Sequence, residues 1–255
     1  MRVVSLVNGS LLSEAATLYA ITYAKSMQLP LTLLFIDNGD ESLEKHRLAV
    51  SSLKELAASQ EVEVESVTLK GDTLTQLQHF SRLYAIDTLF CATRKFTKDH
   101  SFSDKIVKAG LQTDVAVVKI KSVPKVRGYR RVFFAAGDSP HPRAFLLWLG
   151  LLEDESVLGK LCLTPRSYHG FRRTDSSSKR QYIAAPFLQL ARMLHKNVEM
   201  VSVLQPHNAT ELYNYLLVNC FDLVLFDAAA YPQKLLNRVT DATATNSILF
   251  YPRKS

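Results

Sequence analysis

The first half of the chain alternates between two hydrophobic periods, and this alternation restricts its fold more than any other feature. Short apolar runs typical of buried strands stand at residues 2–7, 31–36, 61–69, 88–92 and 115–120. Between these runs, apolar residues recur at helical spacing, as they do at Leu12, Ala15, Ala16 and Tyr19. A further helix is predicted at residues 103–111, and Asp72 is predicted to cap the helix that follows it. Such an alternation predicts a parallel sheet with helices on both faces, joined by right-handed crossovers.

The second half repeats this scheme. Strands are predicted at residues 131–136, 161–163, 198–204, 222–226 and 247–251, and helices at 143–152, 181–195, 208–217 and 233–240. Related tripeptides, Asn8-Gly9-Ser10 and Gly137-Asp138-Ser139, follow the first strand of each half, and Asp87 and Asp222 mark the fourth strands. We therefore predict an α/β fold with two tandem, doubly wound, five-stranded parallel-sheet domains. They would span residues 1–123 and 131–255, with a linker at 124–130.

Charge is distributed unevenly between the halves. Residues 124–255 hold 17 basic and 10 acidic side chains, which accounts for the whole net charge of +7. The basic segment Arg166–Arg180 is predicted to be an aperiodic insert. It would act either as a solvated loop or as a peripheral contact with an anionic membrane. Because few aromatic residues are interleaved with the basic ones, no specific binding of nucleic acid is expected.

Cysteines and hydropathy indicate the compartment. Cys91, Cys162 and Cys220 form no Cys-x-x-Cys pair, so the sequence supports neither a zinc knuckle nor a dithiol site. No apolar stretch approaches the roughly 20 residues that span a bilayer. The first residues lack the long apolar region and cleavage site of a secretory signal. These features predict a cytoplasmic protein with reduced thiols.

At these motifs the chain resembles a tandem universal stress protein. In that family the first strand ends in Asp-Gly-Ser-x-x-Ser-x-x-Ala-Leu, which residues 8–17 follow from Asn8-Gly9-Ser10 through Ser13. The resemblance implies a topology like that of the adenine-nucleotide alpha-hydrolases, a role in stress response, and an ATP or AMP site at the carboxyl ends of the strands. The candidate nucleotide-binding residues that follow from it are Asn8, Gly9, Ser10, Ile36, Asp37, Arg94, Lys95, Ser103, Asp138 and Ser139.

The chain departs from the family pattern at the phosphate loop. The family places Gly-x-x-Gly-x9-Gly-Ser/Thr after the fourth strand, so that backbone N–H groups can cradle phosphates. Here no glycine occurs between Ala92 and Ser103, or between Asp227 and Pro232. The primary expectation is therefore a non-enzymatic regulatory protein with degenerate nucleotide loops, no certain cofactor and a protein partner. Two alternatives stay open: a nucleotide sensor that uses a modified site in domain 1, and a cytoplasmic regulatory module of a membrane transporter.

No catalytic or metal-binding residue is assigned from the sequence. It contains no Gly-x-Ser-x-Gly elbow, no phosphate-binding Gly-x4-Gly-Lys-Ser/Thr loop and no His-Glu-x-x-His motif. Weak ATP hydrolysis is left open. The two domains are expected to form an intramolecular pseudo-dimer through the last strands, residues 115–120 and 247–251, with a further homodimer as an option.

Overall fold

The computed structural model describes residues 1–39, 43–93, 102–121, 129–137, 140–164, 175–201 and 209–253. Internal contacts divide the chain into two compact units: unit 1 is Met1–Val126 with Tyr251–Ser255, and unit 2 is Arg127–Phe250. Of the predicted linker at 124–130, residues 124–128 lie outside the described residues. The end of the chain, which we expected in the second domain, falls in unit 1, where the Arg253 N–H donates to the Asp114 carboxylate at 2.7 Å.

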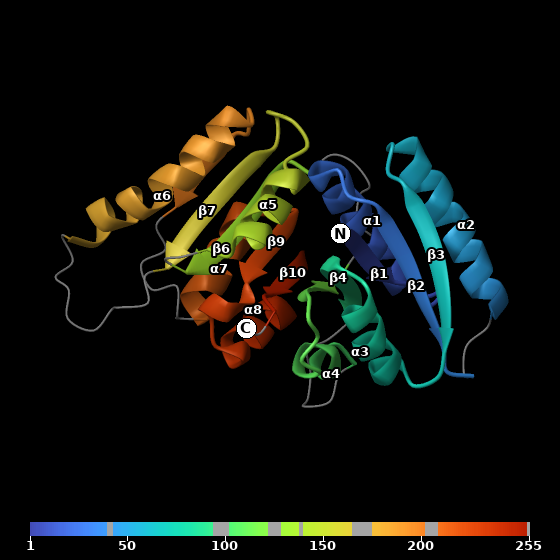
Figure 1. Ribbon diagram of the computed structural model, residues 1–255. Helices are drawn as coiled ribbons and strands as arrows, with labels where there is room; N and C mark the ends of the chain where they lie inside the picture. Colours follow the sequence, from blue (N-terminus) through green and yellow to red (C-terminus); the bar gives the residue numbers. More distant parts are fainter. Residues whose placement is uncertain are drawn as a thin grey trace. The chain divides into compact units, whose positions relative to one another are not determined.

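Unit 1 has the predicted alternation of strands and helices. Its elements are β1 (Arg2–Leu6), α1 (Leu11–Met27), β2 (Leu31–Asp37), α2 (Leu43–Ser59), β3 (Val64–Lys70), α3 (Thr73–Leu83), β4 (Ile86–Thr93), α4 (Phe102–Lys108) and β5 (Asp114–Lys119). The strands pair in parallel in the order β3-β2-β1-β4-β5. Helices α1 and α2 lie on one face of this sheet, and α3 and α4 lie on the other (Figure 1).

Local sequence explains these elements. β2 is buried along almost its whole length and β5 along all of it, as expected of apolar strands covered on both faces. The Ser10 side chain caps α1 by accepting the Ser13 N–H, and Asp72, predicted as a cap, accepts the Thr75 N–H at the start of α3. Helix α1 buries small and aromatic side chains against β1 and β4, which explains why it carries few charges.

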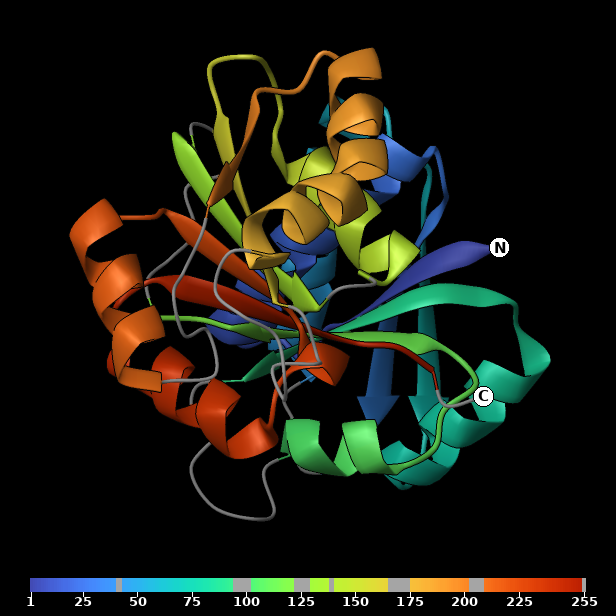
Figure 2. The same ribbon diagram turned by 90° about the vertical axis from the view of Figure 1, so that its left-hand side faces the viewer.

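Unit 2 repeats the architecture. Its elements are β6 (Arg131–Gly137), α5 (Pro142–Leu151), β7 (Leu158–Thr164), α6 (Asp175–Met193), β8 (Val198–Val201), α7 (Ala209–Asn219), β9 (Leu223–Asp227), the short η1 (Ala228–Ala230), α8 (Gln233–Ala242) and β10 (Asn246–Tyr251). The strands run in parallel in the order β10-β9-β6-β7-β8. In Figure 2, α5 and α6 lie on one side of this sheet and α7 and α8 on the other.

One predicted boundary in unit 2 is wrong. The segment Arg166–Arg180 was expected to be aperiodic throughout, but α6 already begins at Asp175. The first turns of this helix are polar, with Ser176, Ser177 and Ser178, so they show no apolar period that the sequence alone would reveal. Residues 165–174 lie outside the described residues.

An aromatic cluster forms the core of unit 2. Trp148 of α5 is fully buried, and its ring lies 5.5 Å from Phe134 and 5.6 Å from Phe145, measured between centroids. Gly159 of β7 leaves the space for it, because a Cβ there would come within 2.7 Å of the indole. Among the helices that the structure describes, none combines the length and the hydropathy needed to cross a bilayer.

Candidate functional site

The strand order of unit 1 fixes where a ligand can bind. The chain runs outward from β1 to β2 and β3, and then returns to place β4 on the other side of β1. In open parallel sheets, ligands bind outside the carboxyl ends of the strands at such a reversal, because the two flanking loops diverge there. The carboxyl ends of β1, β2 and β4 lie together at this edge.

The turn between β1 and α1 is held by a compact set of hydrogen bonds. The Asn8 carboxamide oxygen accepts from the Ser10 hydroxyl at 2.7 Å and from the Ser10 N–H at 3.2 Å. The Ser13 hydroxyl donates to the Ser10 carbonyl at 2.8 Å and accepts the Asn8 N–H at 3.2 Å. The turn is therefore built by its own side chains and presents them in a fixed arrangement at the start of α1.

Gly9 is required in this turn for two reasons. Its φ of +74° lies in the left-handed region, which side chains disfavour. A Cβ built on Gly9 would also lie 3.0 Å from the backbone nitrogen of His46 and 3.0 Å from the carbonyl carbon of Lys45. The turn thus packs directly against the backbone of the first turn of α2.

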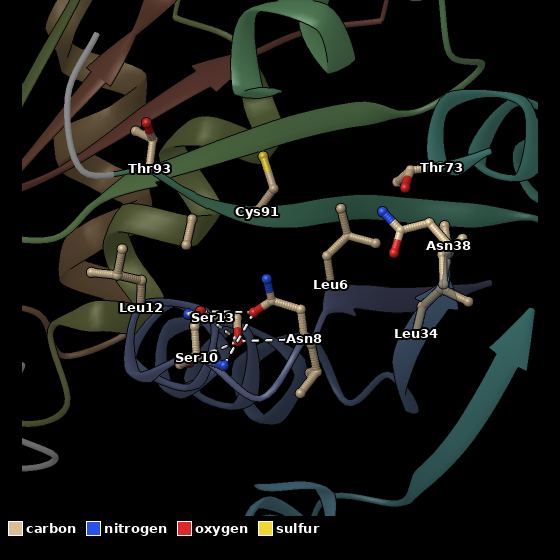
Figure 3. Close-up of a pocket in the computed structure, with 13 residues that line it drawn as sticks. Leu6, Asn8, Ser10, Leu12, Ser13, Leu34, Asn38, Thr73, Cys91 and Thr93 are labelled. Carbon is tan, nitrogen blue, oxygen red and sulfur yellow. Dashed lines mark hydrogen bonds between the residues drawn. The ribbon is translucent and has the colours of Figure 1, made fainter. Parts of the chain in front are cut away.

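A cavity of about 430 Å³ opens at this edge of unit 1, a volume in the range of small-ligand sites. Figure 3 shows the hydrogen-bonded Asn8, Ser10 and Ser13 along one side and Cys91 and Thr93 of β4 along another. The described residues that line it are Leu6, Val7, Asn8, Ser10, Leu12, Ser13, Leu34, Ile36, Asn38, Thr73, Cys91, Ala92 and Thr93. None of these described lining residues carries a charged side chain, so they offer hydroxyl and amide groups on an apolar surface.

The structure brings together part of the predicted set of nucleotide-binding residues. Asn8, Ser10 and Ile36 line the cavity, and Gly9 lies in the turn between the first two. Asp37 is not part of the described lining; its carboxylate accepts the Gly39 N–H at 3.0 Å. Ser103 is buried in α4 and is also absent from that lining. The remaining four candidates, Arg94, Lys95, Asp138 and Ser139, lie outside the described residues.

Sequence reasoning missed several lining residues. Ser13 belongs to the first-strand motif and was not singled out, although its spacing of three residues from Ser10 was visible. Asn38 follows β2 and Thr73 begins α3, so only the sheet topology brings these two to the same edge. Cys91 and Thr93 lie near the end of β4, a strand that is buried along nearly its whole length, so the sequence marks them as buried but not as cavity-lining.

The described lining contains one thiol, that of Cys91, and its reactivity is low in this position. Burial raises the pKa of the Cys91 thiol to about 12, because a thiolate would lose its hydration there. While it is buried, the thiol is therefore protonated at neutral pH and does not act as a nucleophile.

At the corresponding edge of unit 2, two described side chains bond to the backbone near the ends of the strands. The Asp227 carboxylate, at the end of β9, accepts the backbone N–H of His141 at 2.9 Å and that of Ala229 at 3.3 Å. The Tyr231 hydroxyl donates to the Ala136 carbonyl at the end of β6, at 3.4 Å, and its ring packs edge-on against Phe226. Both Asp227 and Tyr231 are buried.

Comparison with known proteins identifies the fold. No family model and no curated protein matches the chain. A universal stress protein from Archaeoglobus fulgidus DSM 4304 aligns with 99% of this chain and 97% of its own, at 11% identity and a TM-score of 0.57. The cytoplasmic domain of a prokaryotic cation chloride cotransporter aligns with 99% of this chain and 95% of its own, at 11% identity and the same score of 0.57.

A universal stress protein in complex with cAMP aligns with 46% of this chain and 95% of its own, at 14% identity; its TM-score of 0.39 is too low to carry an argument. At these identities the alignments show the fold alone. They confirm the predicted α/β class and its likeness to universal stress proteins.

Proposed function

We propose that the chain is a non-enzymatic regulatory protein of the universal stress protein type, in which unit 1 binds a small adenine nucleoside or nucleotide. The observation that carries this proposal is the cavity at the carboxyl ends of β1, β2 and β4, with its polar wall of Asn8, Ser10 and Ser13. The bound ligand would set the affinity of the chain for a protein partner. Catalysis is not part of the proposal, because the Cys91 thiol is protonated and the other described lining residues are neutral.

The two parts of such a ligand would be held differently. The described wall suits a base and a ribose, because its hydroxyl and amide groups can pair with their edges without a net charge. A phosphate needs cations or clustered N–H groups. In this chain the glycines of the family loop are missing, and Arg94 and Lys95 follow directly after Thr93. We assign these two residues to the phosphate.

Titration calorimetry with adenosine, AMP and ATP tests the site. Replacing Ala92 by Leu places a larger side chain in the wall and should weaken all three ligands by at least about tenfold, or about 1.4 kcal/mol. The matched control is Ala58→Leu, the same change at an exposed position of α2. Failure of the wild-type protein to bind any of the three ligands, or equal affinities in the two variants, would contradict the proposal.

A second pair of measurements separates base from phosphate recognition. Changing Arg94 and Lys95 together to Ala should weaken AMP and ATP by about thirtyfold or more, since each of the two lost charge-assisted contacts costs about 1 kcal/mol or more. Adenosine should be unaffected, because it carries no charge. A uniform loss for all three ligands would show that the two residues act on the fold and not on the phosphate.

A regulatory module of a membrane transporter is the second candidate. It is favoured by the alignment of 99% of this chain with the cytoplasmic domain of a cation chloride cotransporter. Co-sedimentation with phosphatidylserine vesicles tests the membrane contact predicted for Arg166–Arg180. Binding at low salt that is lost at high salt would support an electrostatic contact. No binding at low salt, or binding unchanged by replacing the basic residues with Gln, would argue against it.

A further inference from the structure

The first turn of α2 contains a buried histidine, His46, whose ring faces the sheet. His46 is 6% exposed, and its ring stacks on Phe35 of β2 with the centroids 3.8 Å apart and the planes at 17°. Such a position is normally filled by an apolar side chain, because burying an ionisable ring costs free energy unless its polar atoms are paired. Here the imidazole serves as a flat packing surface between helix and sheet.

The Nδ1 atom of the buried ring is itself buried and has no hydrogen-bond partner among the described residues. Burial lowers the pKa of His46, and no neighbouring charge contributes to that shift among the described groups. The charged residues on the elements around it, α1, β2, β3 and α2 itself, are Glu14, Lys25, Asp37, Glu65, Lys70, Glu44, Lys45, Arg47, Lys54 and Glu55.

The backbone of His46 also packs against the turn at Gly9, which forms part of the cavity wall. The space left by the missing Cβ of Gly9 is bounded by the nitrogen of His46 and the carbonyl carbon of Lys45, each 3.0 Å from the position of that atom. The turn that contains Gly9 supplies Asn8 and Ser10 to the cavity. A shift of the first turn of α2 away from β2 would therefore remove the support behind that turn.

We propose that His46 is a proton-sensitive latch for the cavity of unit 1. The neutral ring holds the first turn of α2 against Phe35 and against Gly9. Protonation places a positive charge on a buried ring whose Nδ1 has no partner among the described residues, so it favours states in which this turn has moved away and the cavity wall has loosened. Because the pKa of His46 is lower in the folded protein than in the unfolded chain, the stabilisation is complete above about pH 6.5 and falls as the pH drops below that value.

Labelling of Cys91 by a maleimide reports the state of the cavity, since this thiol lies in its wall. The measurement uses the full chain with Cys162→Ala and Cys220→Ser, so that Cys91 is the only thiol. His46→Phe keeps a flat ring on Phe35 and removes the titration. We expect equal labelling rates for the two proteins at about pH 7.5, and a several-fold faster rate with His46 present at about pH 5, because each pH unit changes the protonation ratio about tenfold. The ratio of the two rates cancels the pH dependence of the thiol itself.

A control and a second measurement keep the test decisive. His79→Gln, at an exposed position of α3, should leave the labelling ratio unchanged. Ring-proton NMR of the wild-type protein should show His46 titrating below about pH 6.5 over the range in which labelling accelerates, so the proposal stays testable if His46→Phe misfolds. Identical labelling profiles against pH with and without the His46→Phe change, or titration of His46 without a change in labelling, would overturn it. No ligand takes part, so this outcome is independent of whether unit 1 binds a nucleotide.

Discussion

Replacing Gly9 by Ala tests whether the turn between β1 and α1 depends on close contact with α2. The change adds one methyl group at a residue with φ of +74° and places it 3.0 Å from two backbone atoms of α2. A left-handed conformation costs a residue with a Cβ about 1 to 2 kcal/mol. Overpacking against backbone that cannot rotate away costs typically about 1 to 3 kcal/mol more. The expected loss in the free energy of unfolding is therefore about 2 to 5 kcal/mol.

Gly110 supplies the matched control, because its φ of +64° is similar but nothing lies within 4 Å of its missing Cβ. The free energy of unfolding of Gly110→Ala should fall only by the cost of the left-handed conformation, about 1 to 2 kcal/mol. Urea unfolding of both variants, monitored by circular dichroism, gives the two losses in the free energy of unfolding. The slope of this free energy against urea concentration should be the same in both variants. Equal losses would refute the reasoning, because they would show that the contact with Lys45 and His46 contributes nothing.

Three further changes test the described contacts. Trp148→Ala removes a fully buried indole from the core of unit 2 and should lower the free energy of unfolding by about 3 to 5 kcal/mol in chemical denaturation. Tyr23→Phe removes the hydroxyl that donates to the buried Asp87 carboxylate at 2.8 Å, and should cost about 1 to 3 kcal/mol. Asp72→Asn keeps a capping side chain on α3 but removes its charge. The hydrogen bond from the Thr75 N–H lowers the pKa of Asp72, so the wild-type carboxylate stabilises the fold above its unfolded pKa and loses that effect as the pH falls through its folded pKa. The Asn variant should lack this part of the acid destabilisation when melting temperatures are compared between neutral and acidic pH.

Each of these expectations can be contradicted by a simple comparison. Leu217→Ala removes an exposed apolar side chain from α7, and a loss as large as that of Trp148→Ala would mean that burial does not set the cost. Thr22→Val in α1 removes a hydroxyl that donates to the Leu18 carbonyl at 3.1 Å, and it should cost less than Tyr23→Phe. The Asp72 argument is contradicted by an unchanged slope of melting temperature against acidic pH in the Asn variant.

The order and type of the elements could be predicted because each leaves a periodic signal in its own residues. The ends of the strands and helices were predicted less accurately, because they depend on caps and tertiary contacts. The predicted strand at 61–69 begins only at Val64, and the predicted helix at 103–111 ends at Lys108. The cap at Asp72 was predicted correctly because the capping side chain and its helix are neighbours in sequence. In contrast, the cavity wall joins Ser13, Thr73 and Cys91, which only the strand order brings to the same edge.

Related motifs in the two units need not imply related sites. The tripeptides at 8–10 and 137–139 follow equivalent strands, and both supplied candidate nucleotide-binding residues, of which Asp138 and Ser139 lie outside the described residues. In unit 2, however, the chain after β9 returns Tyr231 over the end of β6, where its hydroxyl reaches the Ala136 carbonyl. Asp227 binds backbone N–H groups of His141 and Ala229, the kind of donors that a bound anion would otherwise use. A protein carboxylate thus engages backbone N–H groups at this edge of unit 2, whereas the described residues of unit 1 line a cavity at its edge. Because the proposed latch at His46 also belongs to unit 1, the proposed ligand binding and its response to pH are both expected in that unit.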